Sequence, residues 1–159
     1  LGTRQHYNCS VNTIFLDFDG VIHPEFCHES KHLCCLPVFE NVLRRCTGWD
    51  VVITSTWRLQ RSLESLRSLF SDDVASRVLD VTPRFAELHD VPNSLLAYER
   101  EAECNAWLRD NDRMVFPWLA IDDRSWLFRP FNRSVFLVDG RTGLTAVTAE
   151  ELTERLLSL

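Results

Sequence analysis

The stretch from Thr13 to Val21, TIFLDFDGV, constrains the fold of this chain more than any other. Its apolar run contains β-branched and aromatic residues, which predicts a buried strand, and it ends in two carboxylates one residue apart, Asp17 and Asp19. Residues two apart on a strand share a side, and Gly20 allows the backbone to turn in ways that other residues resist. Both carboxylates can therefore face one small volume.

Two carboxylates held this close repel each other unless a cation or a proton lies between them. A divalent metal is the expected counter-charge, and Mg²⁺ suits hard carboxylate oxygens, of which it usually takes one or two. The alternative is a turn in which Asp17 and Asp19 only accept hydrogen bonds from backbone amides. A calcium loop is excluded because no Glu stands at the required distance and because a strand, not a helix, precedes the acids.

Length and charge limit the class of protein. With 159 residues and 45% hydrophobic content, the chain can bury one core, so we expect a single domain at 13–159 after a tail or edge segment at 1–12. The net charge of −6 argues against nucleic-acid binding through phosphate neutralisation, although a local basic cleft is compatible with it. The basic residues are sixteen Arg and one Lys, Lys31, so a cation that faces phosphate is expected to be Arg.

The six cysteines are scattered through a sequence without a signal peptide or an apolar run long enough to cross a membrane. This pattern predicts reduced thiols in a cytoplasmic protein. The first residue is Leu1, not Met, which is compatible with a piece of a longer protein.

Two further apolar runs end in polar side chains. A predicted strand at 49–53 is followed by Thr54 and Ser55, hydroxyls that could help bind an anion at a helix N-terminus or could simply cap that helix. A predicted strand at 117–121 is followed by Asp122 and Asp123. Ligands of open α/β sheets gather beyond the carboxyl ends of the strands, so these side chains are expected to meet Asp17.

The remaining periodicity completes an alternating pattern. We expect helices at 38–47, 59–70, 95–110 and 148–159, with strands at 78–81 and 134–138. The last helix should begin with a capping box in which Thr148 is the N-cap and Glu151 its partner. Alternating strands and helices predict an α/β fold: a three-layer, Rossmann-like parallel sheet with right-handed crossovers and both faces covered.

The segment 21–36 is rich in cysteine and histidine. It holds His23, Cys27, His28, His32, Cys34 and Cys35. The density suggests zinc, but the spacing repeats no pattern of paired zinc ligands. An ordinary covering loop is the favoured interpretation, and metal binding stays open.

Taken together, these motifs resemble those of the haloacid dehalogenase-like (HAD) superfamily of phosphohydrolases. Asp17-Phe-Asp-Gly-Val resembles the first motif, Thr54 the second and Asp122-Asp123 the fourth. The third motif is a basic residue, more often Lys, and Arg100 is the closest match, with Arg58 and Arg84 as alternatives. Three further stretches are similar to the HAD domain of Swiss-army-knife RNA repair proteins: the pairs at 57–58 and 107–108 and the segment at 142–145.

The resemblance implies roles for these residues. Asp17 would be the nucleophile and Asp19 the acid and base, while Thr54, Ser55 and Arg100 would bind the phosphoryl group. The metal residues would be Asp17, Asp19 through its main-chain carbonyl, Asp123, and Asp122 in an orienting role, all around Mg²⁺. The segment 21–36 would be a small flap over the site, in place of a large cap.

The implied function is Mg²⁺-dependent phosphomonoester hydrolysis through an aspartyl-phosphate. Alternatives are a phosphotransferase or an RNA- or DNA-end phosphatase with the same site, and a non-catalytic binding module on the HAD fold. The expected partner is a phosphorylated substrate, and nucleic-acid ends are not favoured by the charge.

Overall fold

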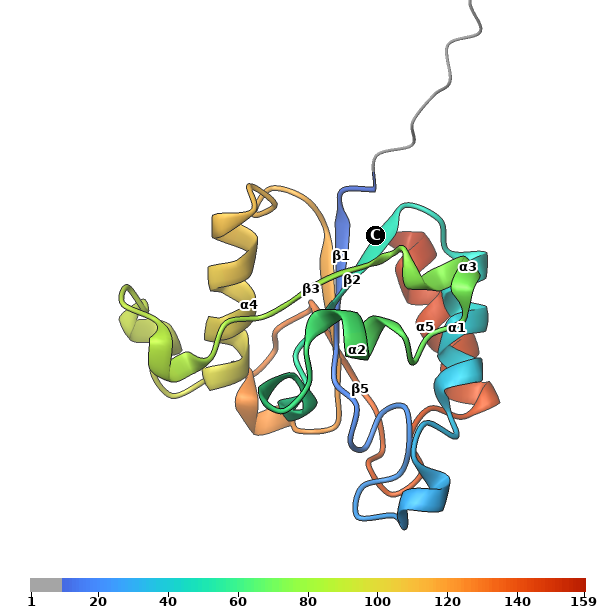
Figure 1. Ribbon diagram of the computed structural model, residues 1–159. Coiled ribbons are helices and arrows are strands. Elements are labelled where there is room, and N and C mark those ends of the chain that lie inside the picture. Colours follow the sequence, from blue (N-terminus) through green and yellow to red (C-terminus); the bar gives the residue numbers. More distant parts are fainter. Residues whose placement is uncertain (1–9) are drawn as a thin grey trace, which may run out of the picture.

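The computed structural model describes residues 10–159, so most of the predicted tail at 1–12 lies outside the described residues. Strands and helices alternate along the chain (Figure 1). The strands are β1 (Asn12–Leu16), β2 (Trp49–Ile53), β3 (Val78–Val81), β4 (Trp118–Asp122) and β5 (Val135–Leu137). They form one sheet in the order β3-β2-β1-β4-β5, and each of the four pairings is parallel. The predicted α/β parallel sheet is confirmed.

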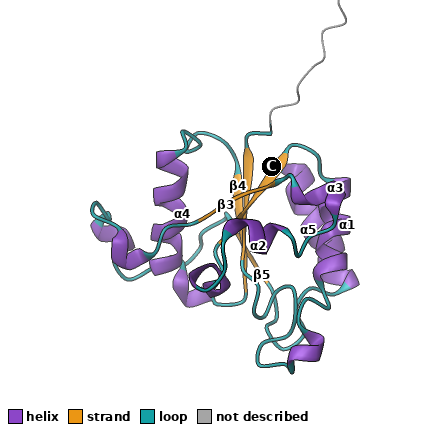
Figure 2. Ribbon diagram, viewed as in Figure 1, coloured by secondary structure: helices purple, strands orange, loops and turns teal. Residues whose placement is uncertain are grey.

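Helices cover both faces of this sheet (Figure 2). The helices are α1 (Leu36–Arg45), α2 (Leu63–Arg67), α3 (Asp72–Ala75), α4 (Glu99–Asp110) and α5 (Ala146–Ser158). Helix α4 lies on one side, while α1 and α5 pack together on the other (Figure 1). The side chains of β1 alternate accordingly: Ile14 and Leu16 join the core under α1 and α5, and Phe15 joins the core under α4. The strands are therefore apolar on both faces, as buried parallel strands are.

The helix predicted at 59–70 is wrong in extent. Residues 56–59 form a 3-10 turn, η2 (Thr56–Leu59), and α2 is only five residues long. The hydroxyl of Ser62 accepts from the amide of Ser65 at 3.1 Å, so α2 starts at Leu63, four residues later than predicted. The helix predicted at 95–110 likewise begins only at Glu99, because Asn93–Leu95 forms a separate 3-10 turn.

The predicted N-cap of the last helix is also wrong. Helix α5 is capped by Thr145, whose hydroxyl accepts from the amide of Thr148 at 3.2 Å, while the Thr148 hydroxyl accepts from the amide of Thr145 at 2.8 Å. Thr148 is thus the third residue of the helix, and Glu151 is exposed and takes no part in the cap. Threonine can be either the N-cap or the third residue of such a box, and the sequence pattern therefore placed the box about one turn too late.

The segment 21–36 forms a compact loop at the end of the sheet where β1 finishes (Figure 1). It contains one 3-10 turn, η1 (Glu29–Lys31), and ends at Leu36, the first residue of α1. It is fastened at its base, where the amides of Cys35 and Leu144 donate to the carbonyls of Ile22 and Val21 at 2.9 and 2.7 Å. Among residues 10–159, no helix combines the length and the apolarity needed to cross a membrane.

Candidate active site

The carboxylates predicted from separate strands meet at one edge of the sheet. Asp17 follows β1, Asp122 ends β4, and Asp123 comes next. Because β1 and β4 are paired in register, the Asp17 amide continues the ladder and donates to the carbonyl of Ile121 at 3.1 Å. One oxygen from each carboxylate of Asp17, Asp122 and Asp123 lies within 4.8 Å of the others. The predicted convergence of these three acids is confirmed.

Two glycines make room for the Asp123 carboxylate. A Cβ on Gly20 would lie 2.3 Å from its Oδ2 atom, and a Cβ on Gly140 would lie 2.6 Å from the same atom. Gly20 also has a φ of +82°, in the region that side chains disfavour. The glycine of the first motif therefore serves both the turn after β1 and the packing of an acid from β4.

Arg100, at the start of α4, reaches into the centre of this group. Its Nη1 atom donates to the hydroxyl of Thr54 at 3.0 Å and to Asp122 Oδ2 at 3.3 Å, and it lies 3.4 Å from Asp17 Oδ1. Burial disfavours the charged guanidinium, but the carboxylates of Asp17, Asp122 and Glu103 oppose this effect and raise the pKa of Arg100. The guanidinium therefore stays charged among the acids.

The two alternative arginines lie elsewhere. Arg58 donates to the backbone carbonyls of Thr54, Ser55 and Thr82. Its guanidinium also pairs with Glu103 at 2.5 Å. Arg84 is largely exposed and lies 4.0 Å from Glu87. Among the three arginines considered, Arg100 is the one that contacts the acids of the site.

The two hydroxyls after β2 differ in their contacts. Thr54 is buried, and its hydroxyl accepts from Arg100, so it lies at the centre of the group. The hydroxyl of Ser55 accepts from the amide of Trp57 at 3.3 Å and caps η2. Its own proton is free to be donated elsewhere, so capping and anion binding remain compatible.

The carboxylate of Asp19 does not join the group formed by Asp17, Asp122 and Asp123, and it has a partner that sequence reasoning did not assign. Its Oδ1 lies 2.7 Å from Nε2 of His23, and about two fifths of the Asp19 side chain is exposed. This hydrogen bond is the main reason why the pKa of Asp19 lies below its usual value. His23 was considered only as part of a cysteine- and histidine-rich segment, although its place four residues after Asp19 across a glycine turn was a usable signal.

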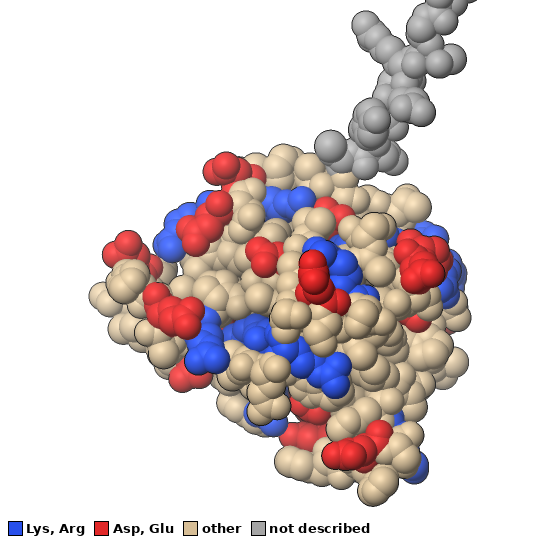
Figure 3. All heavy atoms as spheres, viewed as in Figure 1, with Lys and Arg blue, Asp and Glu red and all other residues tan. Residues whose placement is uncertain are grey.

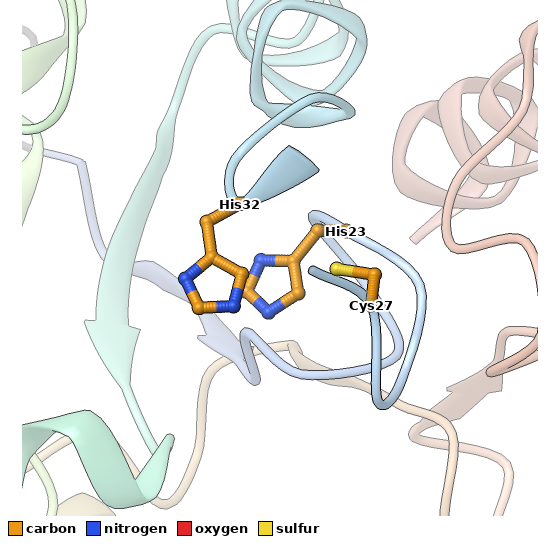
Figure 4. Close-up of side chains that lie close together, drawn as sticks. All are labelled: His23, Cys27 and His32. Atoms are coloured by element: carbon orange, nitrogen blue, oxygen red, sulfur yellow. The ribbon is translucent and has the colours of Figure 1, made fainter. Parts of the chain in front are cut away.

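His23 also belongs to a second close group of side chains. His23, Cys27 and His32 each place one potential ligand atom within 4.8 Å of the others (Figure 4). The imidazole rings of His23 and His32 are stacked, however, with centroids 4.7 Å apart and planes 25° from parallel. Ligating imidazoles direct the lone pairs at their edges toward a shared ion, whereas these rings present their faces to each other.

The three converging acids, Asp17, Asp122 and Asp123, have raised pKa values. Burial, and then the charge of Asp17, raise the pKa of Asp122 to about 7 and that of Asp123 to about 6. Burial also raises the pKa of Asp17, although Arg100 opposes this change. In addition, Oδ1 of Asp123 is buried without a hydrogen-bond partner among residues 10–159. Converging carboxylates with an unsatisfied buried oxygen fit a hard divalent cation such as Mg²⁺.

The pattern of the sequence matches one known family. The model of the HAD domain in Swiss Army Knife RNA repair proteins matches residues 13–149. The chain belongs to this family. The resemblance read from the motifs is thereby confirmed, and the HAD domain accounts for the Rossmann-like sheet and for acids at the ends of β1 and β4. Neither a curated protein nor a solved structure matches the chain.

Membership of the HAD family indicates a phosphatase type of function and a phosphorylated substrate. The surface beside the site is compatible with such a substrate. A pocket of about 260 Å³ opens next to Asp19 and is lined also by His23, Glu25 and Arg124. Positively charged side chains form a band over η2, which follows the end of β2, although the chain is acidic overall (Figure 3).

Proposed function

We propose that this HAD domain is a Mg²⁺-dependent phosphomonoester hydrolase that acts through an aspartyl-phosphate on Asp17. The observation that carries the proposal is the convergence of Asp17, Asp122 and Asp123 with the guanidinium of Arg100 and the hydroxyl of Thr54. A nucleophilic carboxylate, a fixed cation and a hydroxyl donor at one point are what attack on a phosphoryl group requires.

In the first step, an oxygen of Asp17 forms a bond to phosphorus. The bond between phosphorus and the leaving oxygen breaks, and its electron pair stays on that oxygen, which takes a proton from the carboxyl group of Asp19. Asp19 suits this role because it is partly exposed and borders the open pocket, where a leaving group has room.

In the second step, a water oxygen attacks the phosphorus of the aspartyl-phosphate. The bond to Asp17 breaks, its electron pair returns to the carboxylate, and a proton of the water passes to Asp19. Asp19 is left as a carboxylate by the first step, and the carboxylate is the form that accepts this proton.

Arg100, Thr54 and Ser55 would bind the phosphoryl oxygens during both steps. Arg100 is already desolvated and fixed by three carboxylates, so its charge needs no reorganisation when phosphate enters. Asp17, Asp123 and the main-chain carbonyl of Asp19 would hold Mg²⁺, with Asp122 orienting its neighbours. When bound, Mg²⁺ supplies positive charge that offsets the carboxylates and the phosphoryl oxygens.

A second candidate is a phosphatase of nucleic-acid ends with the same chemistry. It is supported by the family description, HAD domain in Swiss Army Knife RNA repair proteins, and by the basic band over η2. In either case, the flap at 21–36 would border the substrate without closing the site as a large cap would. A cytoplasmic location also belongs to this proposal, and it is supported by free thiols at Cys27, Cys34, Cys35, Cys46 and Cys104.

The test is turnover of p-nitrophenyl phosphate by the wild type and by Asp17→Asn, with Mg²⁺ and with a chelator. We expect turnover only for the wild type with Mg²⁺. Turnover by Asp17→Asn at the wild-type rate would refute the nucleophile, and no turnover by a folded wild type on phosphorylated metabolites, nucleotides or oligonucleotides would favour a binding module. Added alcohol acceptors that capture phosphate in place of water would indicate a phosphotransferase.

A further inference from the structure

The turn that follows β1 fixes His23 rigidly against Asp19. The amide of Gly20 donates to the carbonyl of His23 at 2.9 Å, and the backbones of Asp19 and His23 form an isolated bridge. The His23 side chain is 1% exposed, and its ring contacts the rings of His32 and Trp57 at centroid distances of 4.7 and 5.6 Å. The imidazole therefore has one available position.

Both nitrogens of this imidazole have partners, and together they define its tautomer. The amide of Leu33 donates to Nδ1 at 3.3 Å, so Nδ1 carries no proton in the neutral ring. The proton then lies on Nε2, which donates to Oδ1 of Asp19 at 2.7 Å. A zinc ion on His23 would have to displace one of these hydrogen bonds, and the stacking with His32 does not direct the lone pairs to one point.

We propose that His23 is a positioning residue for Asp19: its Nε2–H occupies one carboxylate oxygen so that the other faces the leaving oxygen of the substrate. The Asp19 side chain is partly exposed, and its hydrogen bond with His23 favours one of the rotamers that such a side chain can adopt. When the group is already fixed, the entropy of orienting it does not add to the activation barrier. The inference rests on the proposed function, because it assigns the residue that orients the proposed acid.

The hydrogen bond from Leu33 extends this arrangement into the flap. Leu33 lies near the end of the segment 21–36, and its amide donates to Nδ1 of His23 at 3.3 Å. The flap thus does more than border the pocket. It supplies the donor that selects the tautomer of His23, and through His23 it orients Asp19.

Two substitutions of His23 test its hydrogen bonds with Leu33 and with Asp19 independently. In His23→Asn, the side-chain oxygen can replace Nδ1 as the acceptor for Leu33, but no donor reaches Asp19. In His23→Gln, the longer amide can place its NH₂ group near the position of Nε2 and donate to Asp19. Both are polar residues smaller than or similar in size to His, and circular dichroism and the unfolding midpoint verify that each variant is folded.

The readout is the ratio of kcat/KM for p-nitrophenyl phosphate to kcat/KM for phenyl phosphate. Both substrates have the same ring, but the phenolate leaving group is the more basic and depends more on a proton from Asp19. Because kcat/KM reports events up to formation of the aspartyl-phosphate, the later hydrolysis step does not affect the ratio. We expect the ratio to rise about tenfold or more in His23→Asn and to return toward the wild-type value in His23→Gln.

His32→Leu is the matched control, because it removes the stacking partner of the same ring but leaves the Nε2 donor to Asp19 in place. Its ratio should stay at the wild-type value. Asp19→Asn should raise the ratio as His23→Asn does, and the double variant should show no further rise. An unchanged ratio in a folded His23→Asn variant would overturn the inference. The proposed function fails separately, if the wild type shows no turnover that depends on Asp17.

Discussion

At the scale of single residues, the site depends on a cation held among acids. Arg100 contacts Asp17, Asp122 and Glu103 within 3.3 to 3.5 Å and is almost completely buried. A buried charge that loses its partner is destabilising, so the acids and the arginine stabilise one another as a unit. The same guanidinium is the proposed ligand of the phosphoryl oxygens.

Replacement of Arg100 by methionine should therefore lower kcat/KM for p-nitrophenyl phosphate by about 100-fold or more, because a preorganised donor to the transition state is lost. Arg100→Lys should lie between this variant and the wild type, since lysine keeps the charge but not the planar fork. Arg84→Met, at the exposed alternative arginine, serves as the control and should match the wild type. Full activity of a folded Arg100→Met variant would exclude Arg100 from the site.

Gly20→Ala tests the packing around Asp123. Gly20 and Gly48 have φ values of +82° and +87°, but only a Cβ on Gly20 would meet Asp123, since nothing lies within 4 Å of a Cβ on Gly48. Both alanine variants should lose about 1–2 kcal/mol of unfolding free energy from the left-handed backbone. Only Gly20→Ala should also weaken Mg²⁺ binding and turnover, as urea unfolding, Mg²⁺ titration and kinetics will show. Equal activity of the two variants would contradict the proposed role of this contact.

At the scale of elements, the sequence predicted strands better than helices. The strands at 49–53 and 78–81 have the predicted bounds, because short apolar runs between polar residues have few alternative registers. The helix at 59–70 was too long because several serines in this region can each stop or start a helix, and periodicity does not show which one does. Hydroxyl side chains thus decided the boundaries that the apolar pattern left open.

The cap of α5 provides a test at this scale. Thr145→Ala should lower the free energy of unfolding by about 1 kcal/mol, because the amide of Thr148 loses its acceptor. Glu151→Ala removes the cap partner expected from the sequence and should change stability by less than about 0.5 kcal/mol, since Glu151 is exposed. Urea denaturation measures both values. A larger loss of unfolding free energy in Glu151→Ala than in Thr145→Ala would indicate that Thr148, not Thr145, is the N-cap.

At the scale of the whole molecule, the order of the sheet creates the site. Strand β1 lies between β2 and β4, so their carboxyl ends place Asp17 beside Thr54 and Asp122. This much could be predicted, because strands that alternate with helices form parallel sheets whose ends meet. The partnership of Asp19 with His23 could not, because it depends on the path of an irregular loop and on an amide donated by Leu33.

The pH dependence of stability follows from the buried acids. Without a divalent cation, the pKa of Asp122 is raised to about 7 and that of Asp123 to about 6. An unfolded Asp has a pKa of about 3.9, so from about pH 4 to about pH 7 the folded chain keeps protons that the unfolded chain releases. These two residues therefore make the metal-free protein less stable as the pH rises through this window.

Mg²⁺ binds deprotonated carboxylates, so the stabilisation that it provides should grow over the same pH range. At a concentration about 100-fold above its Kd, it should add about 2.7 kcal/mol. Thermal unfolding midpoints with Mg²⁺ and with a chelator, measured at several pH values, give this difference. Asp123→Asn should remove most of it. A stabilisation by Mg²⁺ that is independent of pH, or unchanged in Asp123→Asn, would contradict the assignment of the metal residues.

The most direct test of the account is to identify the residue that becomes phosphorylated during turnover. The enzyme is mixed with excess radiolabelled p-nitrophenyl phosphate and Mg²⁺, quenched in acid within the first turnovers, digested, and mapped by mass spectrometry. The account predicts label on the peptide that contains Asp17, released by hydroxylamine as an acyl phosphate is. Label confined to another residue, while the enzyme turns over normally, would contradict it.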